Sequence, residues 1–418
     1  MITIYQPQIE TNNNSVRLKC RIIDEFQAID QELWYEVNKE WAKYLCPEVC
    51  DGFIIAMLLP AIKFRQKIVV KAPMSASLYY NMVNVVIPLM AKLYGNNLTI
   101  DEARNFLTVS ETVNPDFHPF SVATGCSMGV DSLTVIKQHI ELSENNSYTL
   151  THLTYFNVGA FGSTYNDETE LTLNREKQEV LNFANKLNLP VVIVNSNIHC
   201  WYSTFKNFNH SHTLRNMSVV LCMQKLLKTY FYASGYSLDN FVISYDLAHF
   251  EALLLPQIST QCTGLISANA NFNRIDKLKY IGNDRLSIEN LYVCLKEQIW
   301  NDHHVGKLDD EGFRNCGKCE KCLRTLIILE SLGILENYRK NFNIDYYYRA
   351  KRIFIRAMYA LRHENDTYSD ILKFDPSLIQ SGGGKEMMLK DFVHRLISKE
   401  KYLQSMRFVS THMYMFVK

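Results

Sequence analysis

In the middle of the chain, segments with the apolar pattern of a strand are followed by segments with apolar residues at helical spacing. This pattern predicts strands followed by helices. Runs rich in β-branched and aromatic residues predict strands, and segments with apolar residues at helical spacing predict helices. The strands are expected at 119–125, 147–158, 190–197 and 240–246, and the helices at 131–142, 167–189 and 212–234. Repeated strand-then-helix units predict an α/β fold whose parallel sheet is covered by helices on both faces.

The two ends of the chain follow other patterns. Residues 1–114 alternate strand-like and helical pieces and are interpreted as a small N-terminal α/β subdomain. Its strands are expected at 17–23 and 67–72, and its helices at 50–62 and 78–93. Residues 335–418 indicate a mainly helical C-terminal extension. The central domain is therefore placed at 115–334.

Composition narrows the classes of protein. The chain has 418 residues, of which 47% are hydrophobic, and a net charge of +1, which suits two or three folded units and argues against a protein that coats nucleic acid. The longest apolar run, 53–62, is shorter than the roughly 20 residues that span a membrane, so no membrane partner is expected. The first residues lack the pattern of a secretory signal, and we expect a cytoplasmic protein with reduced thiols.

The segment TGCSMGVDS, residues 124–132, lies where a predicted strand gives way to a predicted helix. Backbone N–H groups at a helix start favour an anion, and the small residues Gly125, Ser127 and Gly129 allow a phosphate to approach. Asp131 would repel that phosphate unless a cation such as Mg2+ lies between them. The alternative is a plain turn in which Asp131 and Ser132 cap the helix.

The six residues SMGVDS resemble the SGGxDS signature of the PP-loop ATP pyrophosphatases. Met128 takes the place of a residue that is usually glycine in that signature. The resemblance implies a five-stranded parallel sheet sandwiched by helices, of the adenine nucleotide α-hydrolase (HUP-like) type, and an ATP site. It assigns nucleotide binding to Gly125, Ser127, Met128, Gly129, Val130, Asp131 and Ser132. A second glycine-rich segment, SGGGKE at 381–386, departs from the Walker A pattern and is interpreted as a flexible turn.

Three of the 11 cysteines stand at two successive C-x-x-C steps: Cys316, Cys319 and Cys322. This spacing brings three thiolates to one metal ion, and tetrahedral Zn2+ requires a fourth ligand. Cys294 is the first choice for it, with His303 and His304 as alternatives. Buried free thiols or an iron–sulfur cluster are the competing interpretations. A zinc ion with four cysteine ligands has no open position and is structural. Cys126, inside the loop, is either a reactive thiol at a helix start or a small packing residue.

A PP-loop followed by C-x-x-C-x-x-C-L-R, which ends at Arg324, resembles the 7-cyano-7-deazaguanine synthase family. Arg215 and Asn216 resemble that family's Arg-Asn pair and are assigned to cofactor binding. The interval from Cys294 to Cys316 is longer than in the synthases, and both terminal extensions are additional. The chain more closely resembles synthase-like proteins with an added N-terminal subdomain, whose wider kinship includes anti-phage and polysaccharide-cluster proteins.

The resemblance implies a ligase that uses ATP, Mg2+ and Zn2+. A small carboxylate would attack the α-phosphate of ATP, and ammonia or an amine would then attack the acyl-adenylate. Ser127, Asp131 and Ser132 would be the catalytic residues, with Gly129 and Val130 helping to hold pyrophosphate. Arg215 would contact a phosphate or the substrate carboxylate, or else lie on a helix surface.

Other residues leave alternatives open. Asp246 is either a substrate-reading carboxylate at a strand end or a turn former, and Asn269, Arg274 and Lys277 either face the ligand or flank a helix. A basic stretch motivates a second hypothesis, an enzyme that modifies tRNA or another macromolecule: Arg349, Lys351, Arg352, Arg356 and Arg362. A third is a nucleotide-binding subunit of a defence or polysaccharide system that has lost catalysis. The oligomeric state is left open, with a homodimer as one possibility.

Overall fold

The computed structural model describes residues 1–142, 146–160, 167–205, 208–294 and 313–412. It is a mixed α/β structure with one large sheet and a helical C-terminal region. Contacts divide the chain into two compact units. The first unit comprises Met1–Cys126 and Val135–Asn271, and the second comprises Ser127–Thr134 and Phe272–Lys418.

Five parallel strands form one half of the sheet in the first unit. They are β7 (Ser121–Gly125), β8 (His152–Asn157), β9 (Val191–Ser196), β10 (Leu227–Ala233) and β11 (Gly264–Ala268). Their order in the sheet is β11-β10-β7-β8-β9, with every neighbouring pair parallel. The strand order therefore reverses between β7 and β10, as in doubly wound folds, where ligands bind beyond the carboxyl ends of the strands at this reversal. The predicted parallel sheet is confirmed.

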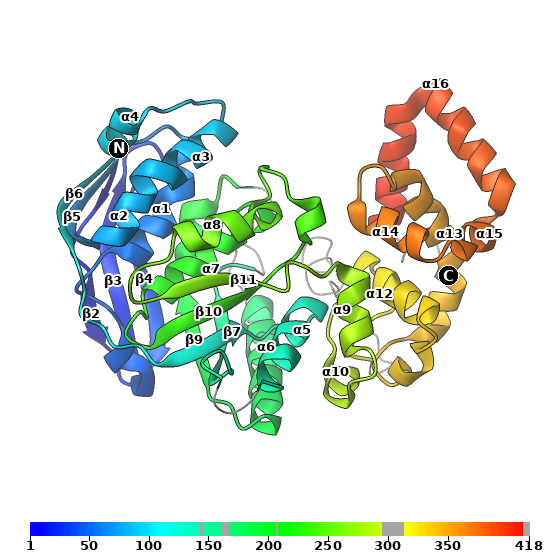
Figure 1. The fold of residues 1–418 in the computed structure, drawn as a ribbon, viewed down its shortest axis with the longest axis horizontal. Coiled ribbons are helices and arrows are strands. Elements are labelled where there is room, and N and C mark those ends of the chain that lie inside the picture. Colours follow the sequence, from blue (N-terminus) through cyan, green and yellow to red (C-terminus); the bar gives the residue numbers. More distant parts are fainter. Residues whose placement is uncertain (143–145, 161–166, 206–207, 295–312, 413–418) are drawn as a thin grey trace. The chain divides into compact units, whose positions relative to one another are not determined.

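Helices follow these strands in the chain. They are α5 (Val130–Ile140), α6 (Asp167–Lys186), α7 (His212–Leu221) and α8 (Glu251–Gln257). In Figure 1, α7 and α8 lie on one face of the parallel strands and α6 on the other. Short helical turns connect these described elements: η3 (Ile198–Tyr202), η4 (Phe208–His210), η5 (Leu238–Asn240) and η6 (Leu247–His249).

Two predicted elements are wrong. The helix expected at 212–234 ends at Leu221, and its second half is β10, because Thr, Tyr and Phe favour a strand and the sheet buries them. The strand expected at 240–246 is irregular, with Phe241, Val242 and Ile243 exposed. Its apolar residues imitate a strand, but 264–268 supplies the fifth strand instead.

The N-terminal strands continue the same sheet. They are β1 (Ile2–Ile4), β2 (Gln8–Thr11), β3 (Ser15–Asp24), β4 (Ile29–Asn38), β5 (Ile68–Ser75) and β6 (Leu107–Val113). β4 pairs antiparallel with β9, where Tyr35 stands opposite Ser196. The strands of residues 1–114 and the five parallel strands thus form one mixed sheet of 11 strands among the described residues.

Helix α1 (Asp51–Lys63) is the central helix of this N-terminal part. Every residue from Asp51 to Ile62 is buried, and the helix packs against α7, β1 and β5. The expected helix at 78–93 is also present, as α2 (Ala76–Asn81), the π-helical turn η2 (Met82–Val86) and α3 (Ile87–Leu93). The remaining helical segments are η1 (Lys39–Tyr44) and α4 (Ile100–Phe106).

The second unit is mainly helical. Its elements are α9 (Arg274–Ile281), α10 (Arg285–Asn290), α12 (Glu320–Ser331), η7 (Leu335–Tyr338), α13 (Ile344–Leu361), α14 (Asp366–Phe374), α15 (Ser377–Gly382) and α16 (Gly384–Thr411). The turn expected at 381–386 is largely wrong, because only Gly383 lies outside a helix, between α15 and α16, with φ of 123°. Among the helices that the structure describes, none is long and apolar enough to cross a membrane.

Candidate functional site

The loop that precedes α5 presents unused hydrogen-bond donors. The first helical bond runs from the Leu133 N–H to the Gly129 carbonyl, at 3.0 Å. The N–H groups of Val130, Asp131 and Ser132 come before it and have no partner among the described residues. The hydroxyls of Ser127 and Ser132 lie 3.2 Å apart, and Ser132 also donates to the Gly129 carbonyl. A helix start with free donors and two hydroxyls is chemically suited to an anion.

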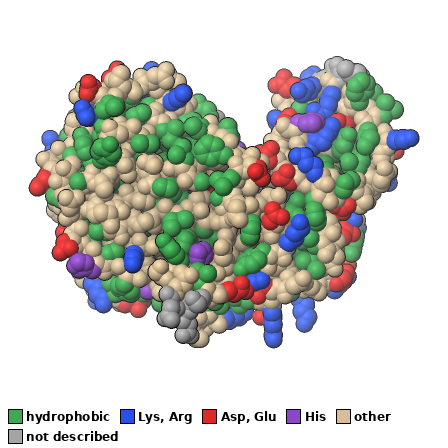
Figure 2. All heavy atoms as spheres, in the orientation of Figure 1, with side chains coloured by type: hydrophobic (Ala, Val, Ile, Leu, Met, Phe, Trp, Pro, Cys, Tyr) green, Lys and Arg blue, Asp and Glu red, His purple; other side chains and the backbone are tan. Residues whose placement is uncertain are grey.

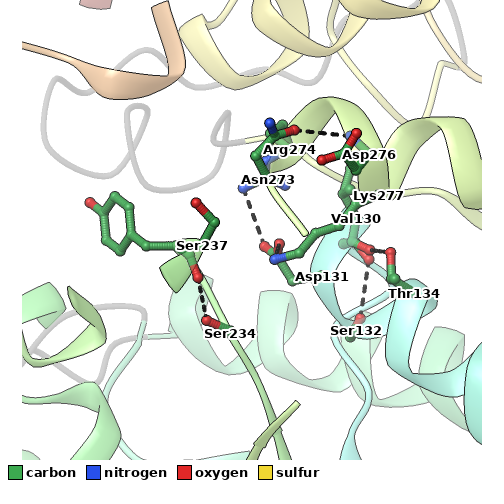
Figure 3. A network of polar contacts seen from close by, with 12 residues as sticks. Val130, Asp131, Ser132, Thr134, Ser234, Ser237, Asn273, Arg274, Asp276 and Lys277 are labelled. Atoms are coloured by element: carbon green, nitrogen blue, oxygen red, sulfur yellow. Dashed lines mark hydrogen bonds and ion pairs between the residues drawn. The ribbon is translucent and has the colours of Figure 1, made fainter. Parts of the chain in front are cut away.

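Asp131 forms ion pairs with two basic side chains of α9 (Figure 3). The Lys277 Nζ lies 2.8 Å from Oδ1, and an Arg274 nitrogen lies 3.2 Å from Oδ2. The Lys277 side chain is 1% exposed and that of Asp131 is 25% exposed. Burial opposes ionisation of Asp131, yet the nearby charges of Arg274, Lys277 and Arg324 together lower its pKa. Asp131 is therefore an ionised carboxylate that protein cations already neutralise.

The start of α9 explains why these two cations reach the same carboxylate. The side chain of Asn273 caps the helix by accepting the N–H groups of Ile275 and Asp276, at 2.9 and 3.0 Å. Arg274 and Lys277 are three residues apart and so share one helix face. The sequence left open whether Arg274 and Lys277 face the ligand or flank a helix. Both side chains lie on α9 and face the loop residue Asp131. No local sequence pattern signalled the contact with Asp131, because 146 residues separate Lys277 from Asp131.

Met128 occupies a left-handed backbone conformation, with φ of 56°. Glycine adopts this conformation without steric cost, which accounts for the usual glycine of the signature. The Met128 side chain is 2% exposed, and its Sδ lies 3.1 Å from an Arg314 nitrogen. The Met128 carbonyl accepts the Tyr292 N–H at 2.8 Å. The side chain is thus buried in protein contacts. Cys126 is buried too, which suits a packing residue.

Four cysteines of the second unit form a group that fits one metal ion. The Sγ atoms of Cys294, Cys316, Cys319 and Cys322 all lie within 4.8 Å of one another. Those of Cys316 and Cys322 are 3.9 Å apart, close to the edge of about 3.8 Å in a tetrahedron with zinc–sulfur bonds of about 2.3 Å. The choice of Cys294 as the fourth member of the group is confirmed. His303 and His304 lie outside the described residues.

The neighbouring thiols favour the thiolate form of Cys316. Hydrogen bonds from Cys294, Cys319 and Cys322 hold the pKa of Cys316 far below its ordinary value, and the Lys318 N–H contributes at 3.3 Å. Gly317 has φ of 65°, and a Cβ there would lie 2.3 Å from the Asn343 carbonyl oxygen. Only glycine permits this tight turn.

Arg324 follows these cysteines on α12, as the resemblance expects. Its Nη1 lies 3.3 Å from the Glu320 carboxylate, which also accepts a hydrogen bond from the Tyr368 hydroxyl at 3.1 Å. Glu320 therefore holds Arg324 where its charge acts on Asp131. Sequence reasoning missed Glu320. Its position four residues before Arg324 is the ordinary signal for a helical ion pair.

The other predicted site residues belong to the first unit. Gly125 ends β7, and Arg215 lies in the first turn of α7 with 4% of its surface exposed, so the helix-surface alternative for it is wrong. Asn216 donates to the His212 carbonyl at 2.7 Å and to the Tyr232 hydroxyl at 3.5 Å. Asn269 follows β11 in a left-handed conformation, with φ of 59°.

Asp246 is a turn former. Its carboxylate accepts the Ala248 N–H at 3.1 Å and thereby caps the short helix η6 (Leu247–His249). The strand that was expected to end at Asp246 does not exist, so the argument for a substrate-reading carboxylate at a strand end fails.

Much of the basic stretch on α13 is engaged within the second unit. Lys351 pairs with Glu330 at 2.7 Å, Arg362 pairs with Asp391 at 3.2 Å, and Arg356 donates to the Gly382 carbonyl at 2.7 Å. On the face drawn in Figure 2, acidic and basic side chains intermingle. These pairings weaken the case for a nucleic-acid surface, which needs cations free to meet phosphates.

The second unit thus brings together a loop whose first N–H groups have no partner in the described part of the chain, a carboxylate held by two cations, and four cysteines that fit a metal ion. Gly125, Arg215 and Asn216 lie in the first unit. Comparisons with protein-family models, curated proteins and solved structures found no match.

Proposed function

We propose that the protein is an ATP-dependent enzyme that activates a small carboxylate as its acyl-adenylate and passes it to ammonia or an amine. The observation that carries the proposal is the loop at the start of α5, whose donors and hydroxyls stand beside the Asp131–Lys277 ion pair. The resemblance of SMGVDS to the PP-loop signature supports a nucleotide as the ligand. The loop follows β7, next to which the strand order reverses, and ligands of doubly wound sheets bind at such a reversal.

The reaction needs stabilisation of negative charge on the departing pyrophosphate. The N–H groups of Val130, Asp131 and Ser132 can donate to its oxygens, together with the Ser127 and Ser132 hydroxyls. Lys277 and Arg274 supply positive charge, and Asp131 holds both in place. Mg2+ bound to ATP would neutralise further phosphate charge. Because two basic side chains already pair with Asp131, a role of Asp131 as a magnesium ligand requires them to shift.

The four cysteines take no part in this chemistry under the proposal. A metal with four thiolate ligands lacks an open position, so Zn2+ held there would act as a structural clamp. A nucleotide-binding subunit without catalysis was considered because Met128 replaces a glycine of the signature. The Met128 side chain is buried beside Arg314, which weakens that reason.

ATP–pyrophosphate exchange tests the proposal because it requires the adenylation step alone. We expect the purified protein with Mg2+ to exchange labelled pyrophosphate into ATP when a panel of small carboxylates contains a substrate. Lys277→Met and Asp131→Asn should lower the exchange rate by about 100-fold or more, as for loss of a charge-stabilising group. Lys279→Met is the matched control, since Lys279 lies on the same helix and its side chain is 48% exposed.

Two results would contradict the proposal. One is the absence of both ATP binding and pyrophosphate exchange in the wild-type protein at millimolar ATP with every carboxylate of the panel. The other is an exchange rate in Lys277→Met equal to that of Lys279→Met. Stimulation by tRNA in place of a small carboxylate would favour the macromolecule-modifying alternative.

A further inference from the structure

Strand β6 forms one end of the sheet in the first unit, next to β5 (Figure 1). It pairs in parallel with β5 on one side. On its other side no strand lies among the described residues, and residues 108–113 form no backbone hydrogen bond there within the described chain. This seven-residue strand therefore presents a row of unused backbone N–H and C=O groups, which is a template for pairing with another strand.

The sequence of β6 lacks the features that usually protect an edge strand. Such strands commonly carry lysine, proline or a bulge. β6 reads LTVSETV, in which Glu111 is the one charged residue. The irregularity of the β5–β6 ladder lies in β5, where the two residues between Val70 and Pro73 stand opposite Ser110. The edge that β6 presents is thus a regular strand, rich in the β-branched residues that favour strand pairing.

Helices α2 and α4 add apolar surface beside this edge. Both helices pack against β6. Each carries a large apolar side chain that the described chain leaves exposed, Tyr80 of α2 at 66% and Ile100 of α4 at 49%. Apolar side chains exposed beside an unpaired edge are typical of a surface that another chain covers.

The side chains of β6 match those of a second copy in one antiparallel register. A two-fold axis normal to the sheet at Ser110 sets each residue opposite the one that lies equally far on the other side of Ser110. Three kinds of pair then form with the second copy: Leu107 with Val113, Thr108 with Thr112, and Val109 with Glu111. Apolar pairs and Thr–Thr pairs stabilise such a ladder. A register centred on Glu111 would set two carboxylates opposite each other, which destabilises it.

We infer that β6 is the interface of a homodimer, in which the β6 strands of two copies pair antiparallel about Ser110 and join their sheets into one. The unused backbone groups of each strand satisfy those of the other. Two-fold symmetry closes the interface, so the assembly stops at two copies. The inference concerns the N-terminal part of the first unit and does not depend on the proposed ATP chemistry.

Analytical ultracentrifugation of the full chain over a range of concentrations tests the dimer, and two double variants test its register. Thr108→Lys/Thr112→Lys sets like charges opposite each other at both Thr–Thr pairs, and we expect a monomer. Thr108→Lys/Thr112→Glu changes the same two positions but sets opposite charges there, so we expect it to stay a dimer. Both residues are exposed, so both variants should keep the fold, as judged by circular dichroism.

A disulfide cross-link tests the register independently, in a Cys200→Ser background that removes an exposed thiol. In the inferred register the two copies of residue 110 lie directly opposite, with Cβ atoms about 4.5–5.5 Å apart, so Ser110→Cys should give a disulfide-linked dimer in mild oxidant. The two copies of residue 108 lie about 13 Å apart along the strands, so Thr108→Cys is the matched control and should not cross-link.

Three results would each overturn the inference. The first is a wild-type protein that is monomeric at every concentration. The second is the same oligomeric state in the two double variants, whether monomer or dimer. The third is cross-linking of Thr108→Cys as readily as of Ser110→Cys.

Discussion

At the scale of single residues, the Asp131–Lys277 pair makes a structural prediction that is separate from activity. Asp131→Asn would remove the carboxylate that lies 2.8 Å from the buried Lys277 ammonium, and a buried charge that loses its ion pair is costly. Lys277→Met leaves Asp131 partly exposed and still paired with Arg274. We therefore expect Asp131→Asn to lower the free energy of unfolding by about 2–4 kcal/mol and Lys277→Met by about 1–2 kcal/mol.

Denaturant unfolding measures both values, with Lys279→Met as a control that should stay within about 0.5 kcal/mol of wild type. If Lys277→Met proved the more damaging of the two, the ion pair would not be what holds this part of the unit together.

His152 of β8 makes a prediction about pH. It is buried, with its ring centre 5.7 Å from that of Trp41 and 6.1 Å from that of Phe120. Burial lowers the pKa of His152. A depressed pKa means that the unfolded chain binds a proton that native His152 resists, so stability falls as pH drops below about 6.5. The same direction applies to His139 and His199.

Urea unfolding between pH 7.5 and pH 5 should show this loss, and His152→Gln should reduce its slope by up to about 1.4 kcal/mol per pH unit. His118→Gln is the control, because the His118 side chain is 85% exposed. An unchanged slope in His152→Gln would show that His152 protonates equally in both states.

At the scale of elements, the cysteine turn and α12 depend on one another. Three ligands stand on this turn and the start of α12, and the fourth comes from a segment about 20 residues earlier. We expect about one zinc per chain by elemental analysis. Zinc binding contributes about 10–16 kcal/mol of folding free energy in small zinc domains. We therefore expect the free energy lost on zinc removal to exceed the stability that the second unit has without the metal.

Cys322→Ser should abolish metal binding and unfold the helices of the second unit, as seen by circular dichroism and proteolysis. Cys200→Ser, which changes an exposed thiol outside the cluster, should do neither. Iron in place of zinc, or metal-free protein purified without chelator that remains folded, would contradict the zinc assignment.

Elements also mark where sequence reasoning succeeded and failed. β7, β8, β9, α5 and α6 were predictable because each has one clear period and a turn at its ends. β10 was missed since the apolar residues of α7 run into it without Gly or Pro, so periodicity alone could not find the boundary. Cys316, Cys319 and Cys322 were predictable from spacing, whereas Cys294 was a choice among alternatives. The partners of Asp131 were not, because a contact across 146 residues leaves no local pattern.

At the scale of the molecule, residues 1–114 are integral to the sheet of the first unit. β4 covers the edge of β9, and α1 packs against α7. A chain shortened to residues 115–418 would expose a strand edge and the apolar face of α7. We expect it to be insoluble or unfolded, judged by size-exclusion chromatography and circular dichroism. Co-expression with residues 1–114 should restore soluble protein. A monomeric, folded 115–418 would instead support an independent central domain.

The burial of α1 also bears on how the chain is made. A ribosome completes α1 early, whereas its packing partner α7 lies roughly 160 residues further on. At a synthesis rate of about 5–20 residues per second, the apolar segment FIIAMLLPAI waits on the order of 10–30 s for that partner. During this interval the nascent chain displays a surface that chaperones bind. A helix that is buried from Asp51 to Ile62 in the finished protein is thus open to aggregation while the protein is being synthesised.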